Sequence, residues 1–177
     1  ISVRELIERE DLGGGMLPGK HVKAVLPGGA SMGVLSADEL DMKMDFEDTR
    51  KFGLLGLGTA AAVVIDHDTD IRIVLRNLTR FYATESCGQC TQCREGTSWM
   101  YKIATRIALG AGRLEDLDII LETARNMGMM PGLSICGLPD GATYPIETLV
   151  KKFRPELESA IRAQTKNSAE SLLKVLN

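Results

Sequence analysis

The chain has few of the compositional features that indicate a function by themselves, such as a high net charge or long hydrophobic runs. Its 177 residues include four cysteines and one tryptophan, and its net charge is only −3. The small charge, with Lys and Arg residues scattered along the chain, excludes the basic surface typical of nucleic-acid-binding proteins. A hydrophobic content of 44% with 25% charged residues indicates a globular protein long enough for one domain or two small ones.

Long hydrophobic runs are also missing. The longest candidates, such as Ala60–Ile65, have the length of a buried strand and fall well short of the roughly 20 residues of a membrane-spanning helix. No basic segment followed by an apolar one opens the chain, so we predict neither a signal peptide nor a transit peptide. Because the first residue is Ile1 rather than Met, and the first expected element is a helix without a preceding strand, we expect a chain truncated at its N-terminus.

The first part of the chain, residues 1–69, mixes short strand-like runs with glycine-rich turns. The expected strands fall within His21–Gly29, Met32–Ser36 and Ala60–Asp66. Ser2 is expected to cap a short helix before them. These residues predict a small α+β unit.

From Asp70 onward the hydrophobic period changes from two to about 3.6, which predicts helices. We expect four or five helices packed as a bundle over residues 70–165, followed by a polar tail at 166–177. Trp99 shares a predicted core stripe with Ile103 and Ile107. Pro145 suits the first turn of a later helix, and Pro155 either kinks that helix or starts another.

Two glycine motifs imitate nucleotide-binding loops. Gly14–His21 has the spacing of a phosphate loop, but His21 replaces the magnesium-binding Ser or Thr and the segment leads into a strand instead of a helix. Gly56–Ala61 has a dinucleotide-type spacing but precedes a strand instead of following one. Neither motif predicts nucleotide binding, and His21 and His67 are expected at loop or strand-end surface positions.

The cysteines form the pattern with the most chemical content. Cys87, Cys90 and Cys93 follow a C-x2-C-x2-C spacing, and Cys136 stands alone in a glycine-rich stretch. Such crowding favours metal binding over disulfides. Three ligands on one short loop with a distant fourth suit a [4Fe-4S] cluster, whereas zinc sites usually come as two C-x2-C pairs; zinc remains the alternative. With all four irons bound to protein, the cluster would carry electrons and not act as a Lewis acid.

The residues around the cysteines support an anionic cluster. Small residues, Ser86, Gly88 and Thr91, let the main chain approach it closely. A helix expected to start near Arg94 would direct its free N–H groups toward the cluster, and Arg94 itself adds a positive charge.

Several segments resemble a known family. Phe81–Met100, Ser134–Ile146 and Phe153–Leu157 closely resemble the C-terminal half of the NADH-binding flavoprotein subunit of respiratory complex I, and the diaphorase subunits of NAD-linked hydrogenases and formate dehydrogenases. The family motif E-S-C-G-x-C-x-P-C-R-E-G is matched from Glu85 to Gly96, except that Gln92 replaces its proline. Upstream, Val22–Leu35 resembles the end of that subunit's ubiquitin-like β-grasp domain.

The resemblance implies a truncated β-grasp unit at 1–69 and an all-α bundle at 70–165 that carries the cluster on Cys87, Cys90, Cys93 and Cys136. It implies a relay that takes single electrons from FMN, after NADH has reduced the flavin in a domain absent here, and passes them to a neighbouring large iron-sulfur subunit. The chain by itself is not expected to be catalytic. The alternative is a structural or subunit-docking module with a four-cysteine zinc site.

The resemblance also implies partners and a location. A small thioredoxin-like iron-sulfur subunit and the large iron-sulfur subunit are the expected partners, with quinone reached only indirectly. The assembly would lie on the cytoplasmic side of a bacterial inner membrane, or on the matrix side in a mitochondrion, as a peripheral part of a membrane complex.

Overall fold

A computed structural model describes residues 1–128 and 134–163 of the chain. It opens with helix α1 (Val3–Glu8), whose N-cap Ser2 accepts a hydrogen bond from the Glu5 N–H while the Glu5 carboxylate accepts one from the Ser2 N–H. This reciprocal capping box confirms the predicted role of Ser2.

Three strands form a small antiparallel sheet in the order β2-β1-β3. They are β1 (Val22–Leu26), β2 (Leu35–Ser36) and β3 (Val63–Asp66). Val25 on the central strand pairs with Leu35 on one side and Val64 on the other. Between β2 and β3 lie the short helices η1 (Ala37–Glu39) and α2 (Asp48–Lys51).

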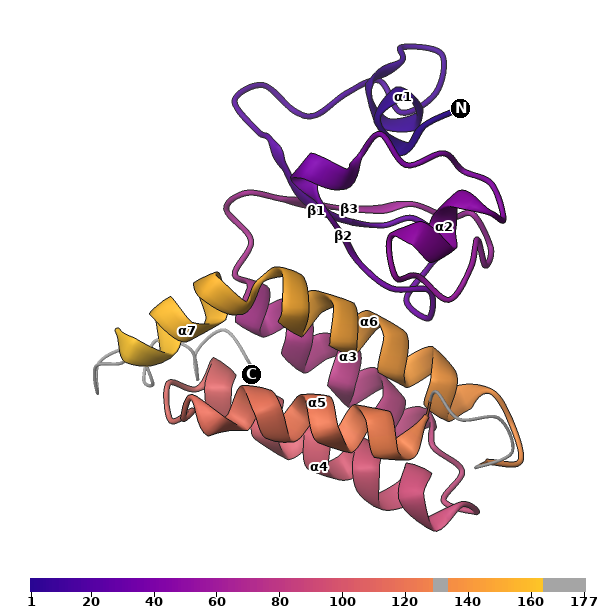
Figure 1. Ribbon diagram of the computed structural model, residues 1–177. Coiled ribbons are helices and arrows are strands. Elements are labelled where there is room, and N and C mark those ends of the chain that lie inside the picture. The colour runs from indigo at the N-terminus through magenta and orange to yellow at the C-terminus, as the bar shows by residue number, and fades with distance from the viewer. Residues whose placement is uncertain (129–133, 164–177) are drawn as a thin grey trace.

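The rest of the described chain is helical, as the change of hydrophobic period predicted. The helices are α3 (Ile71–Glu85), α4 (Thr91–Ala108), α5 (Glu115–Met127), α6 (Leu138–Lys152) and α7 (Arg154–Arg162). α3 packs beside α4 and α6, and α5 packs beside the same two helices, so these four close into a bundle (Figure 1). The sheet lies on the α3–α6 side of this bundle, away from α4 and α5.

Strand β1 contributes to two hydrophobic clusters because its side chains alternate between two faces. Ala24 and Leu26 belong to the large cluster that fills the helical bundle, whereas Val25 belongs to a smaller cluster with α1 and η1 neighbours such as Val3 and Leu40. A hydrogen bond from the buried Val34 N–H to Thr148 Oγ1 of α6, 2.8 Å long, also joins the two parts. The prediction of an α+β arrangement is thus confirmed as a small sheet followed by helices, while the β-grasp assignment of residues 1–69 stays a prediction.

Three helical details differ from the sequence-based expectation. Pro145 lies inside α6 rather than in its first turn, because α6 is buried between the sheet and the bundle and packing outweighs the lost backbone hydrogen bond. Trp99 is 54% exposed, since the buried face of α4 runs one residue aside through Met100, Ala104 and Ile107. Helix α4 begins at Thr91, before the expected Arg94. Pro155, by contrast, starts α7, which is one of its two expected roles.

Two further expectations concern membrane-spanning helices and the C-terminal tail. None of the helices in the described ranges has the combination of length and apolar character needed to cross a bilayer. The predicted polar tail at 166–177 lies outside the described residues.

Candidate metal centre

The first three cysteines lie where α3 ends and α4 begins. Ser86 caps the C-terminus of α3, and its N–H donates to the Tyr82 carbonyl at 3.1 Å. Cys87 follows in the loop, Cys90 is the N-cap of α4, and Cys93 lies in the first turn of that helix. The C-x2-C-x2-C spacing therefore spreads three thiols over a loop and a helix start.

The loop depends on one left-handed residue and one clamp. Gly88 has φ +80°, a conformation that costs other residues free energy. The Arg94 guanidinium donates from Nη1 to the Gly88 carbonyl oxygen at 2.7 Å and from Nε to the Glu95 carboxylate at 3.0 Å. Arg94 thus ties the loop to the first turn of α4, in addition to adding the expected positive charge beside Cys93.

The fourth cysteine lies at the same end of the bundle. Cys136 comes directly before α6, whose N-cap is Gly137, and Figure 1 shows the start of α6 beside the connection from α3 to α4. The N–H of Ile135 donates to Sγ of Cys90 at 3.4 Å, so the two cysteine-bearing loops touch. The hydroxyl of Ser134, on the surface of this second loop, donates to the Cys136 carbonyl oxygen at 2.9 Å.

The four thiols differ in exposure. Cys87 and Cys136 are exposed, Cys90 is half-buried, and Cys93 is buried. Burial raises the pKa of the Cys93 thiol; a hydrogen bond from Ser86 opposes the rise, and the negative charges of Cys136, Cys90 and Cys87 add to it. All three other cysteines are therefore close enough to act on Cys93 electrostatically, and a metal bound here would reverse this mutual repulsion.

The donor set fits an iron-sulfur or zinc centre better than a hard cation. Thiolates are soft ligands that select zinc or iron-sulfur clusters, and the α4 and α6 N-termini, both at the cysteines, favour negative charge. Within residues 1–128 and 134–163, no three His, Cys, Asp or Glu side chains are grouped closely enough to hold a metal ion. The fold brings both cysteine loops to one end of the bundle, but the described side chains do not form a closed metal site. The role of Cys87, Cys90, Cys93 and Cys136 as ligands therefore stays a prediction.

Sequence reasoning missed one polar contact to these sulfurs. Ser86 was expected only to make room for the main chain, yet its Oγ lies 3.3 Å from Sγ of Cys93 and shares a hydrogen bond with it. The available signal was a hydroxyl residue directly before the first cysteine, at the expected end of a helix.

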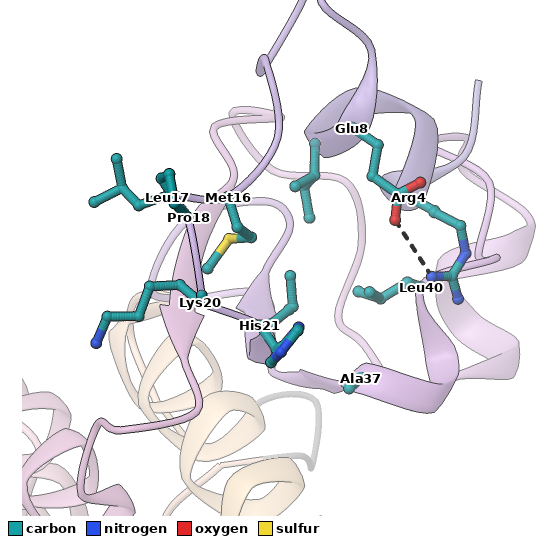
Figure 2. Close-up of a pocket in the computed structure, with 12 residues that line it drawn as sticks. Arg4, Glu8, Met16, Leu17, Pro18, Lys20, His21, Ala37 and Leu40 are labelled. Carbon is teal, nitrogen blue, oxygen red and sulfur yellow. Dashed lines mark ion pairs between the residues drawn. The ribbon is translucent and has the colours of Figure 1, made fainter.

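The two glycine motifs that imitate nucleotide-binding loops lie away from the cysteines. Gly14–His21 lies in the connection from α1 to β1, and its residues Met16–His21 line a pocket of the small N-terminal part (Figure 2). This part of the fold lies on the side of the sheet away from α4 and α5 (Figure 1). Figure 2 shows Lys20 extending away from the Arg4–Glu8 ion pair, and Lys20 is itself paired with Asp66 at 3.1 Å and with Asp68. Its charge is already neutralised by two carboxylates, which argues against a phosphate role.

The other two expectations for this part hold. Gly56–Ala61 forms a bend that leads into β3, with Gly58 and Ala60 both at positive φ. His21 and His67 are exposed, and the His21 N–H donates to Nδ1 of His67 at 3.2 Å.

Comparisons with known proteins agree with this arrangement. Residues 73–160 match a family model described as the NADH-ubiquinone oxidoreductase-F iron-sulfur binding region. The chain is 40% identical over 164 residues to the F subunit of NADH-quinone oxidoreductase from Rickettsia akari, covering 92% of this chain and 37% of that protein. It is also 40% identical over 173 residues to mitochondrial NADH dehydrogenase [ubiquinone] flavoprotein 1 of Dictyostelium discoideum, covering 97% of this chain and 35% of that protein.

A solved structure is similar as well. An NAD+-reducing [NiFe]-hydrogenase in the H2-reduced state aligns with a TM-score of 0.76 and 27% identity, over 92% of this chain and 26% of that one. The chain thus spans little more than a third of the curated relatives it matches. Residues 73–160 thus belong to the NADH-ubiquinone oxidoreductase-F iron-sulfur binding region, and the homologues of the chain are F subunits of complex I.

Proposed function

We propose that Cys87, Cys90, Cys93 and Cys136 bind one [4Fe-4S] cluster through which the chain relays single electrons. The observation that carries the proposal is the hydrogen bond from the Ile135 N–H to Sγ of Cys90, which joins the loop before α6 to the loop before α4. Two loops that touch at the N-termini of two helices can supply sulfur ligands to a common centre.

The chain's own residues provide what such a centre needs. A [4Fe-4S] cluster held by four cysteines supplies reversible one-electron storage. The N-termini of α4 and α6, together with Arg94, offset the negative charge of four thiolates. Because Cys93 is buried whereas Cys87 and Cys136 are exposed, electrons would enter or leave such a centre on the side of Cys87 and Cys136.

We propose a place for this relay within a longer protein. The relatives are named as an NADH-quinone oxidoreductase and as NADH dehydrogenase flavoprotein 1, and these names support an enzyme in which NADH passes a hydride to FMN. The flavin would be bound outside the present chain, which then takes its electrons one at a time. Clusters of a large iron-sulfur subunit would accept them next, beside a small thioredoxin-like subunit.

The remaining parts of the proposal concern architecture and location. Residues 1–69 would be a ubiquitin-like β-grasp unit and residues 70–165 the cluster-binding bundle. The assembly would be peripheral to the cytoplasmic side of a bacterial inner membrane, or to the matrix side in a mitochondrion. The mitochondrial relative from Dictyostelium supports the second location.

Anaerobic purification tests the cluster directly. We expect a brown protein with about four iron and four sulfide per chain and, after reduction, an electron paramagnetic resonance (EPR) signal from one cluster. A colourless protein with one zinc per chain would contradict the relay and favour the structural alternative.

Cys136→Ser in the complete enzyme separates a relay from a docking module. Under the relay proposal, NADH still reduces the flavin but electron transfer to quinone is lost, because the fourth ligand is missing. Ser134→Ala is the matched control, since it removes a side chain from the same loop without removing a thiol. If the Cys136→Ser enzyme assembles and keeps normal electron transfer to quinone, the relay role of this site is wrong.

A further inference from the structure

The contact between Ser86 and Cys93 has a fixed geometry. Ser86 is held at the end of α3 by its N–H bond to the Tyr82 carbonyl. Tyr82 is itself buried, and its hydroxyl donates to the Ala30 carbonyl oxygen at 3.2 Å and lies 3.1 Å from Ser31 Oγ. The position of Ser86 therefore depends on the packing of α3 against the loop after β1, which the Tyr82 hydroxyl contacts.

The sulfur partner is equally constrained. Cys93 is 6% exposed, the most buried of the four cysteines, and its carbonyl accepts a hydrogen bond from Thr97 Oγ1 at 2.8 Å. A hydrogen bond in a buried environment is electrostatically stronger than one in water. The 3.3 Å contact from Ser86 Oγ to Cys93 Sγ therefore lies where it can act most strongly.

Binding of iron fixes the direction of this hydrogen bond. The free thiol can donate or accept, but an iron-bound Cys93 sulfur carries no proton, so the Ser86 hydroxyl must donate to it. Such a bond withdraws negative charge from the sulfur. Because the reduced cluster carries one more electron than the oxidised cluster, it gains more from the donor, and the reduction potential rises.

We propose that Ser86 is a positioning residue that raises the reduction potential of the cluster by donating its hydroxyl to Sγ of Cys93. This inference rests on the proposed [4Fe-4S] site. Ser86 is not a ligand, and removing its hydroxyl leaves all four thiols in place.

A redox titration of the 177-residue chain, purified anaerobically with its cluster and followed by EPR, tests the role of Ser86. Ser86→Ala should shift the midpoint potential to more negative values, and Ser86→Thr, which keeps the hydroxyl, should restore a potential close to that of the wild type. Ser134→Ala should leave the potential unchanged, because its hydroxyl donates to the Cys136 carbonyl rather than to a sulfur. After exchange into deuterated water, the reduced wild-type cluster should show one deuterium coupling more than the Ser86→Ala cluster, because the Ile135 N–H that donates to Sγ of Cys90 exchanges in both.

The outcomes that overturn the inference differ from those that overturn the proposed function. A fully loaded Ser86→Ala chain with the wild-type potential contradicts the role of Ser86 alone, as does an equal shift in Ser134→Ala. If Ser86→Ala does not load, Ser86→Val provides a second variant without the hydroxyl. If neither apolar variant holds a cluster while Ser86→Thr does, Ser86 acts in assembly and its role in setting the potential is wrong. A wild-type chain that binds zinc instead contradicts the cluster itself.

Discussion

At the scale of single residues, the cysteine loop depends on a backbone conformation that few side chains tolerate. Gly88 separates Cys87 from Cys90 at φ +80°, and its carbonyl is the acceptor for Arg94. Gly137, directly after Cys136, has an ordinary φ of −79° and no atom within 4 Å of the position that a Cβ would occupy. These two glycines therefore differ in what they contribute, although both flank predicted ligands.

This difference predicts unequal effects of substitution. Gly88→Ala should disfavour the observed loop conformation by about 1–2 kcal/mol, because an alanine resists the left-handed region. We expect less iron per chain after reconstitution and faster loss of iron to a chelator. Gly137→Ala is the matched control and should retain iron as the wild type does. Equal iron retention in Gly88→Ala and the wild type would show that the loop rearranges when the cluster binds.

At the scale of elements, one buried carboxylate joins α4 to α5. Asp116, in the first turn of α5, is fully buried and accepts hydrogen bonds from Arg106 Nε of α4 at 3.0 Å and from the Arg113 N–H at 2.8 Å. Burial by itself would raise the pKa of Asp116, but the bonds from Arg106 and Arg113 outweigh it and hold the pKa below its usual value. The contacts between α4 and α5 therefore stabilise the charged form of the Asp116 carboxylate.

Asp116→Asn should lower the free energy of unfolding by about 2–3 kcal/mol at pH 7, because charge-assisted hydrogen bonds are lost in a buried site. Since the folded-state pKa is lowered, this stabilisation is complete above the unfolded pKa of about 4 and disappears as the pH falls through the folded value. Urea unfolding at pH 7, 4 and 3 should therefore show a shrinking difference between variant and wild type.

Asp118→Asn provides the control in the same helix turn. Its carboxylate is 67% exposed and pairs with Arg154 at 2.7 Å, so the loss should stay below about 1 kcal/mol. A difference for Asp116→Asn that stays constant from pH 7 to pH 3 would contradict the assigned ionisation.

At the scale of the whole molecule, the sheet and the bundle share hydrophobic core. Ala24, Leu26 and Ile65 of the sheet lie in the same cluster as the bundle helices, and the opposite face of β1 contributes Val25 to the smaller cluster. The division into units at residues 1–69 and 70–165 stays a prediction. The shared strand predicts that the two parts nevertheless unfold together.

Trp99 allows this coupling to be measured, because it is the single tryptophan and lies in α4, far in the fold from the smaller cluster. Val25→Ala, a truncation of a fully buried side chain, should lower the free energy of unfolding by about 2 kcal/mol. We expect the urea midpoint recorded by Trp99 fluorescence to fall together with that recorded by circular dichroism. Val63→Ala is the control, since Val63 on β3 is 51% exposed. An unchanged Trp99 midpoint in Val25→Ala would show that the two parts unfold independently.

Much of this arrangement follows from local sequence. Ser2 and Glu5 predict their capping box, the change of period at Asp70 predicts the helices, and the spacing of Cys87, Cys90 and Cys93 predicts the candidate centre. Pro145 and Trp99 were misplaced because period and propensity describe one element at a time. Neighbours that are distant in sequence bury α6 on several sides. They also decide that the buried face of α4 lies one residue away from Trp99.

The sequence by itself determined which groups are available: four thiols, an arginine beside them and helices on both sides. Only the tertiary structure decided which groups meet. It brings Ile135 to Cys90 across 45 positions of the chain, buries Cys93 while leaving Cys136 exposed, and turns the Ser86 hydroxyl toward a sulfur. The physical reason is that hydrogen bonds and desolvation act over a few ångströms in space, whereas spacing along the chain fixes such distances only within a single turn or helix.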